Sequence, residues 1–155
     1  MKRLLISPEE VLEIAFGTPE GLRPELVGDV RIETAQLKYL KPVFGTLYDR
    51  LGEEAYAPFV TDYLKRPLAL YLKALTLDNA AVTIGALGVT QTETGYAVPG
   101  SPDQLARLRQ QTRTEADILL RKAVEEVERH PERFPGYDPR ENILNRISCR
   151  GGVAL

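Results

Sequence analysis

The sequence offers few side chains for catalysis, because its 155 residues include one histidine and one cysteine. His130 stands directly before Pro131 at the expected end of a helix, where the helix dipole favours a cation, so we expect a structural role for it. Cys149 lies among arginines in the sequence ISCRGG, but no second histidine or cysteine completes a nucleophilic or metal site. Neither residue predicts a reaction.

Carboxylates are the remaining candidates for metal binding. Glu125, Glu126 and Glu128 lie near the expected end of a helix, but their spacing spreads them around it, which favours a solvated face. Glu53 and Glu54 are interpreted in the same way. The sequence has no G-x-x-x-x-G-K-[ST] loop, and IGALG lacks the glycine spacing of a dinucleotide site. We therefore expect no enzyme activity, no metal and no cofactor.

The charges are nearly balanced, with 20 basic and 22 acidic residues and a formal net charge of -2. A dedicated nucleic-acid-binding domain is usually clearly basic, so this balance argues against that class. Arg140, Arg146 and Arg150, near the C-terminus, are candidates for contact with DNA or with a neighbouring subunit. A solvated or subunit-contacting end is the preferred interpretation of such scattered arginines.

Targeting signals are not apparent in the sequence. A single cysteine permits no intrachain disulfide, and the start of the chain, MKRLLISPEE, has only three consecutive apolar residues. That run is too short for the core of a signal peptide, and no segment reaches the roughly 18 apolar residues that span a bilayer. We expect a protein made in the cytoplasm and not inserted in a membrane. Such a protein can still leave the cell inside a virus particle.

Hydrophobic periodicity predicts a mainly α fold, a compact bundle of about four helices. A chain of this length favours one domain, which we place at residues 1–137, with a C-terminal extension at 138–155. The expected helices cover residues 8–16, 29–51, 57–79 and 102–129, and a short helical turn is expected at 142–147.

Capping residues and prolines define the ends and bends of these helices. Ser7, with Glu10 three residues later, predicts a capping box at the first helix, and Gly17 closes that helix. Pro42 and Pro67 fall inside the second and third helices, where each removes a hydrogen bond and predicts a kink or a break. The sequence FPGY after the last long helix predicts an apolar turn that packs back on the bundle.

The middle segment ALGVTQTETGYAVPGSPDQL, residues 86–105, interrupts the helical pattern. Valine and threonine are enriched there between glycines, so we expect a β-hairpin or extended arm over residues 82–100. An isolated hairpin is marginal in water, so its apolar residues must be covered by its own bundle or by another subunit. We hypothesise that a neighbouring subunit buries Ile84, Leu87, Val89, Tyr96 and Val98.

Three longer stretches in this order resemble the head-tail connector, or head-completion adaptor, proteins of tailed phages and prophages, in the form common in phages of Bacteroidetes. They are AQLKYLKPVFGTLYDRL, KRPLALYLKALTLDNAAVTIGALGV and SPDQLARLRQQTRTEADILLRKAVEEVERHPERFPGY. The resemblance covers residues 4–137 and depends on P-x-x-G-x-L-Y at Pro42 to Tyr48, on GV opening the middle segment, and on FPGY.

The resemblance implies a structural protein of the virion neck that acts by binding. Such proteins are helical and assemble as rings, often of twelve copies, between the portal and the tail or stopper proteins. DNA passes through the central channel without sequence recognition. A projecting arm between the last two long helices would then be covered by ring neighbours or by the portal.

Two other interpretations remain open at this stage. One is a stand-alone bacterial helical binding or regulatory domain, in which the glycine-rich segment forms a ligand- or peptide-binding loop around Tyr96. The other is a small enzyme that uses carboxylates and tyrosine. The connector interpretation predicts a protruding element on an isolated subunit, whereas the binding-loop interpretation predicts a concave pocket.

Overall fold

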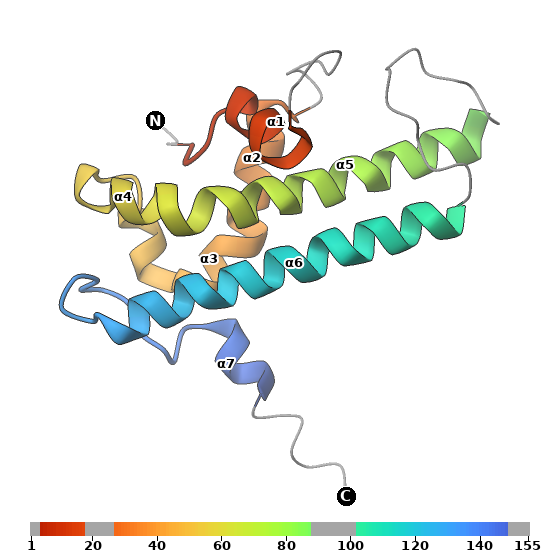
Figure 1. Ribbon diagram of the computed structural model, residues 1–155. Coiled ribbons are helices and arrows are strands. Elements are labelled where there is room, and N and C mark those ends of the chain that lie inside the picture. The colour runs from red at the N-terminus through yellow and green to blue at the C-terminus, as the bar shows by residue number, and fades with distance from the viewer. Residues whose placement is uncertain (1–3, 18–26, 88–101, 149–155) are drawn as a thin grey trace, which may run out of the picture.

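The computed structural model describes residues 4–17, 27–87 and 102–148, which form a mainly α-helical bundle (Figure 1). Side chains are described for 4–17, 27–77 and 103–146. No strand occurs in these stretches, so the predicted mainly α class is confirmed. The α-helices are α1 (Pro8–Phe16), α2 (Asp29–Ala35), α3 (Lys41–Phe44), α4 (Ala57–Phe59), α5 (Lys65–Leu87), α6 (Pro102–Arg129) and α7 (Ile143–Ser148).

Shorter helical turns connect several of these α-helices. They are the π-helical segments η2 (Gln36–Leu40) and η5 (Val60–Leu64) and the 3-10 segments η3 (Gly45–Arg50) and η4 (Glu54–Tyr56). Pro42 follows the end of η2, and Pro67 follows the end of η5. Because proline lacks an N–H and its ring crowds the carbonyl four residues earlier, a wider turn before it relieves the conflict. Neither proline therefore ends its helical run.

The predicted capping box at the start of α1 is confirmed. Ser7 Oγ accepts a hydrogen bond from the Glu10 N–H at 3.3 Å, and the Ser7 N–H donates to Glu10 Oε2 at 3.0 Å. The helix ends at Gly17, whose φ of 77° is a conformation that side chains with a Cβ seldom adopt. Its inner face buries Val11, Leu12 and Ala15.

Two lysines of α5 hold the two ends of α1. Lys65 Nζ donates to Glu10 Oε1, and this bond holds the pKa of the Glu10 carboxyl below its usual value. Lys73 Nζ donates to the Ala15 carbonyl at 3.0 Å, near the other end of the helix. Helices shorter than roughly 12 residues are marginal in water, so α1 depends on its packing against α5.

Helix α5 is the centre of the bundle, with α1 and α6 on opposite sides of it (Figure 1). Helices α5 and α6 run antiparallel, and the buried Tyr71 on α5 donates a hydrogen bond to Asp117 on α6. The Tyr71 ring also stacks on Tyr39 of η2, with ring centroids 3.9 Å apart. These contacts join the three longest helical runs of the chain.

The predicted packing of the FPGY turn on the bundle is confirmed. Phe134 is 3% exposed. Its ring lies 4.7 Å from the Phe59 ring in an edge-on arrangement and 5.9 Å from the Tyr56 ring. Aromatic pairs at these separations add to the free energy gained by burial. The turn after α6 is thus part of the core.

The predicted start of the β-hairpin at residue 82 is wrong, because residues 82–87 form the last turns of α5. The stretch before Leu87 contains three alanines, which favour helix, and it extends a long helix that has already been nucleated. Those two effects outweigh the strand preference of Val82 and Ile84. Ile84 and Leu87 therefore belong to α5, whereas Val89, Tyr96 and Val98 lie outside the described residues.

Replacing Phe134 by alanine should lower the free energy of unfolding by about 3–5 kcal/mol, because it removes a buried ring from between two others. Urea unfolding followed by circular dichroism measures the change. The control is Ile118→Ala, because Ile118 is 57% exposed and its truncation should cost far less. Equal losses for the two variants would contradict the packing described for the turn.

Candidate functional site

The residues first considered for chemistry lie apart from one another. Within residues 4–17, 27–77 and 103–146, no three His, Cys, Asp or Glu side chains are close enough to hold a metal ion. His130 follows the end of α6, with Nδ1 3.3 Å from Glu132 and Nε2 3.7 Å from Glu126. Its position at the helix end is the one predicted. Cys149 lies outside the described residues.

The three glutamates near the end of α6 have different surroundings. Glu126 is largely buried and lies within 4 Å of Arg129, His130 and Arg133. Glu128 accepts a hydrogen bond from the Tyr137 hydroxyl at 3.0 Å, and Glu125 is exposed. The predicted spread of these carboxylates around the helix is confirmed, but the predicted solvated face is wrong for Glu126, whose side chain is 12% exposed.

A pocket of about 480 Å³ lies between the start of the chain and η2; we call it the N-terminal pocket. Its lining consists of Leu4, Leu5, Glu33, Gln36, Leu37, Lys41, Tyr48, Asp49, Gly52 and Glu53. Three leucines supply its apolar part, and three carboxylates and one lysine supply its charge. The lining of the pocket is therefore partly apolar, and most of its charged side chains are acidic.

Gln36 fixes the shape of the N-terminal pocket. This side chain is 2% exposed. Its Oε1 accepts the Leu5 N–H at 2.8 Å, and its Nε2 donates to the Tyr48 hydroxyl at 3.2 Å. A buried amide is costly unless it is bonded, so these two bonds hold the start of the chain and η3 against η2.

Two large apolar side chains are exposed on the same side of the helical run that contains α2 and η2. Val30 is 76% exposed and Leu37, which lines the N-terminal pocket, is 43% exposed. Their separation of seven residues places them on one helical face. Single exposed apolar side chains are common on protein surfaces, so this face is a candidate contact surface because Leu37 adjoins the N-terminal pocket.

The second exposed apolar position lies on α6. Ile118 is 57% exposed, while the opposite face of the helix buries Ala116, Leu120 and Ala123. Arg121 and Lys122, three and four residues further on, are exposed beside it. Two nearby acids are engaged within the chain, because Glu115 pairs with Arg66 and Asp117 accepts from Tyr71, whereas Glu125 is exposed four residues after Arg121. The outer side of α6 around Ile118 is therefore apolar and cationic; we call it the α6 face.

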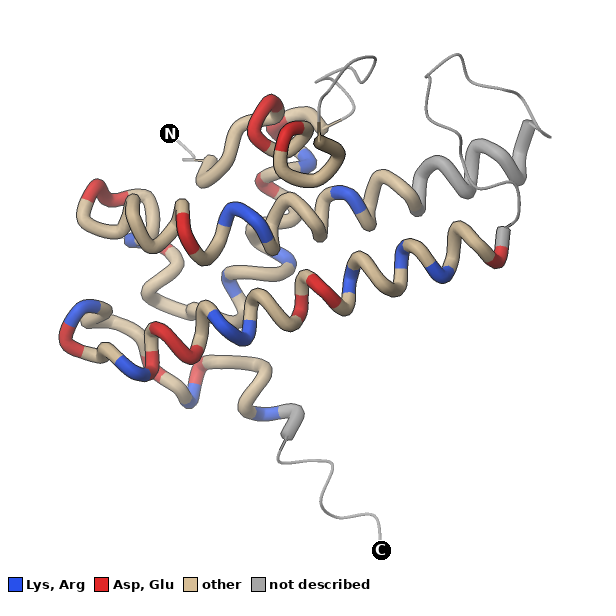
Figure 2. Tube along the Cα trace, in the orientation of Figure 1, with Lys and Arg blue, Asp and Glu red and all other residues tan. Residues whose placement is uncertain are grey.

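Charge is divided between these two parts of the molecule (Figure 2). Residues 4–56 contain ten acidic and five basic side chains. Helix α6 contains six of each sign: residues 107–122 hold five basic and two acidic side chains, and three acidic ones follow at residues 125–128. Figure 2 shows acidic positions on α1 and basic positions recurring along α6, on the other side of α5. Counting charge by segment would have found this division from the sequence, but the total of -2 conceals it.

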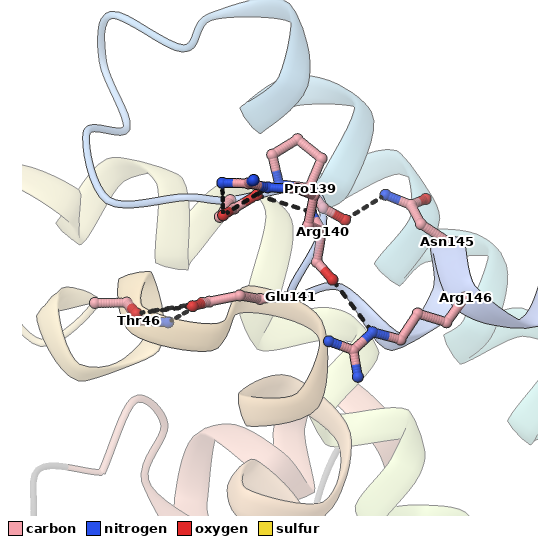
Figure 3. Close-up of polar contacts among 7 residues, drawn as sticks. Thr46, Pro139, Arg140, Glu141, Asn145 and Arg146 are labelled. Atoms are coloured by element: carbon pink, nitrogen blue, oxygen red, sulfur yellow. Dashed lines mark hydrogen bonds and ion pairs between the residues drawn. The ribbon is translucent and has the colours of Figure 1, made fainter.

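Residues after Tyr137 are attached to the bundle through Glu141 (Figure 3). Glu141 Oε2 accepts the Thr46 N–H at 3.0 Å and the Thr46 hydroxyl at 3.2 Å. Gly45 makes this approach feasible, because its φ is 51° and an added Cβ would lie 2.1 Å from Glu141 Oε2. The buried Asn142 donates to the Tyr137 hydroxyl at 2.9 Å and adds a second attachment.

The arginines predicted to contact DNA or a neighbour are exposed where the structure describes them. Arg140 forms an ion pair with Asp138 at 2.9 Å, which keeps the pKa of the Asp138 carboxyl below its usual value. Arg146 Nε donates to the Arg140 carbonyl at 3.2 Å (Figure 3). Arg150 lies outside the described residues, and contact with DNA stays a prediction for all three.

Comparison with known proteins gives one family. Residues 28–147 match the model of a family described as "Family of unknown function (DUF6712)". The match begins just before α2 and ends within α7, so it includes both Gly45 and Glu141. No curated protein and no solved structure matches the chain. Among the described helices, none is long and apolar enough to cross a membrane.

Replacing Gly45 by alanine should destabilise the fold by about 1–3 kcal/mol, because positive φ is strained for alanine. The new methyl group should also displace Glu141 from Thr46. Gly136→Ala is the matched control, since Gly136 has a φ of 104° but an added Cβ meets nothing within 4 Å. Urea unfolding should show a larger loss for Gly45→Ala, and an equal loss would argue against the Glu141 contact.

The Tyr137 hydroxyl should make stability depend on alkaline pH. Burial, supplemented by the Glu128 carboxylate, raises its pKa from 10.0 to about 12. Between these values the folded state holds the proton that the unfolded state releases, so the stability present below pH 10 is lost as the pH rises towards 12.

Urea unfolding of the wild type and of Tyr137→Phe from pH 9 to pH 11 measures this effect. The variant should show a smaller decline in unfolding free energy, since it has no phenol at this position to titrate. The pKa of the Tyr71 hydroxyl is also raised, mainly by burial, and that residue is present in both proteins, so its effect cancels in the comparison. Parallel declines would contradict the assignment to Tyr137.

Proposed function

We propose that this chain, which belongs to the DUF6712 family, is a non-enzymatic structural protein of a tailed phage or prophage. Its role is that of a head-tail connector or adaptor, made in the host cytoplasm and built into the neck of the virion. Copies assemble as a ring below the portal, and the resemblance in sequence implies about twelve of them. DNA passes through the ring without being read.

The observation that carries the assembly part of this proposal is the pair of exposed apolar surfaces. Leu37 and Ile118 are exposed on different helical runs, and among the five exposed large apolar side chains of the described residues they are the ones beside the N-terminal pocket and on the α6 face. Within the described residues, no buried side-chain nitrogen or oxygen lacks a hydrogen-bond partner. A bundle with a well-satisfied interior and two unsatisfied surfaces is suited to contact with other protein molecules.

The connector part of the proposal is supported by the resemblance in sequence, whose signature residues have specific places in the fold. P-x-x-G-x-L-Y covers most of α3 and the start of η3, where Gly45 leaves room for the Glu141 side chain. FPGY forms the turn that returns the chain to the core through Phe134. These residues preserve a particular bundle and supply no reactive group, which agrees with a role in binding.

Purified virions of the phage or induced prophage that encodes this chain provide the test. Quantitative mass spectrometry should find the protein in particles, at a copy number close to that of the portal. Coexpression with the portal protein of the same genome should give a complex that electron microscopy resolves as a ring, whereas a portal from an unrelated phage should not. Absence of the chain from intact particles that contain portal and tail proteins would refute the proposal.

A further inference from the structure

We propose that copies of this chain associate head to tail, with the α6 face of one copy seated in the N-terminal pocket of the next. This inference rests on the proposed function as a ring component, and it identifies the contact between ring neighbours. Ile118 enters the apolar part of the pocket, and Arg121 and Lys122 lie against its carboxylates.

The two surfaces are complementary in their chemistry. The pocket offers Leu4, Leu5 and Leu37 as an apolar floor and wall in about 480 Å³, large enough to receive an isoleucine side chain. The α6 face offers one protruding apolar side chain, Ile118, that is 57% exposed. Seating it there covers apolar surface on both partners, which is the usual driving force of association.

The charges around the apolar residues are also complementary. Glu33, Asp49, Glu53 and Lys41 line the pocket, and Glu53 also pairs with Arg50 at 3.0 Å, so the lining is acidic by a small margin. No ion pair within the described residues involves Arg121 or Lys122, so both cations are available to a partner. Opposite charge across an interface orients the encounter and disfavours the wrong pairing of surfaces.

The positions of the surfaces favour a ring or a filament over a closed pair. The α6 face and the start of the chain lie on opposite sides of α5, so one copy can use both surfaces at once (Figure 1). A two-fold pair would need both surfaces of one copy to face the same partner, and surfaces on opposite sides of α5 cannot do so. Contact between two different surfaces repeats from copy to copy, and it closes into a ring if the rotation allows.

Two variants, each changing one exposed side chain, separate the surfaces. Ile118→Glu places a carboxylate on the α6 face, and Leu37→Asp places one in the apolar part of the pocket; both positions are exposed, so the fold should be retained. Circular dichroism and thermal unfolding verify that retention. The matched control is Ile14→Glu, because Ile14 is 39% exposed on α1 and does not line the pocket.

Sedimentation equilibrium of the full chain at increasing concentration gives the readout. The wild type and Ile14→Glu should associate beyond the dimer, and each of the two surface variants alone should weaken association at least tenfold. An equal mixture of Ile118→Glu and Leu37→Asp should associate and stop at the dimer, because the two altered surfaces both carry a carboxylate and repel each other. The first variant keeps an intact pocket and the second an intact α6 face, so one productive contact forms.

Three results would overturn the inference. They are a wild type that stays monomeric at millimolar concentration, a mixture that does not associate, and a mixture that grows beyond the dimer. Raising the salt concentration should also weaken association of the wild type, since exposed charges contribute to the contact. If the mixture fails while the chain still forms a complex with its portal, only the subunit contact is rejected and the connector role stands.

Discussion

The fold depends on the requirement that α5 be covered on every side. Residues 67–72 of this helix are all buried, and six consecutive residues sweep about one and two-thirds turns of an α-helix. A helix on the surface of a bundle would expose part of such a run. Helices α1, α2 and α6 therefore have to surround α5, and α1 in particular is too short to be stable without it.

Polar groups at the boundary of this apolar centre decide how the surrounding helices are placed. Tyr71 is buried on α5, yet its hydroxyl reaches Asp117 on α6, so the two long helices are aligned by a hydrogen bond as well as by apolar packing. Lys65 and Lys73 do the same for α1, because each binds a different end of it. Apolar contact alone is not directional, whereas these bonds select one arrangement.

Local signals in the sequence predicted the features whose cause is local. Ser7 and Glu10 are three residues apart, and the capping box they form needs nothing from the rest of the chain. The FPGY sequence places the apolar Phe134 in a turn, which predicted that the turn packs on the bundle, and Phe134 is buried there. The exact end of α5 was not predicted, because strand preference at Val82 competes with extension of a helix that is already formed.

The candidate surfaces were harder to find, because they depend on tertiary placement. Gln36 falls four residues after Ile32 on an apolar face, a position where a polar side chain must be bonded, but its partners Leu5 and Tyr48 are known only once the chain is folded. By contrast, the position of Ile118 outside the apolar stripe of α6 can be recognised from the sequence.

The complementarity of the two surfaces bears on the solubility of a single copy as well as on assembly. An apolar side chain such as Ile118 flanked by cations, and a leucine-lined pocket flanked by carboxylates, each resist contact with a surface like themselves. Random association through the exposed apolar groups is thereby disfavoured, while the one complementary pairing is retained. A chain with balanced total charge can in this way remain dispersed and still recognise its neighbour.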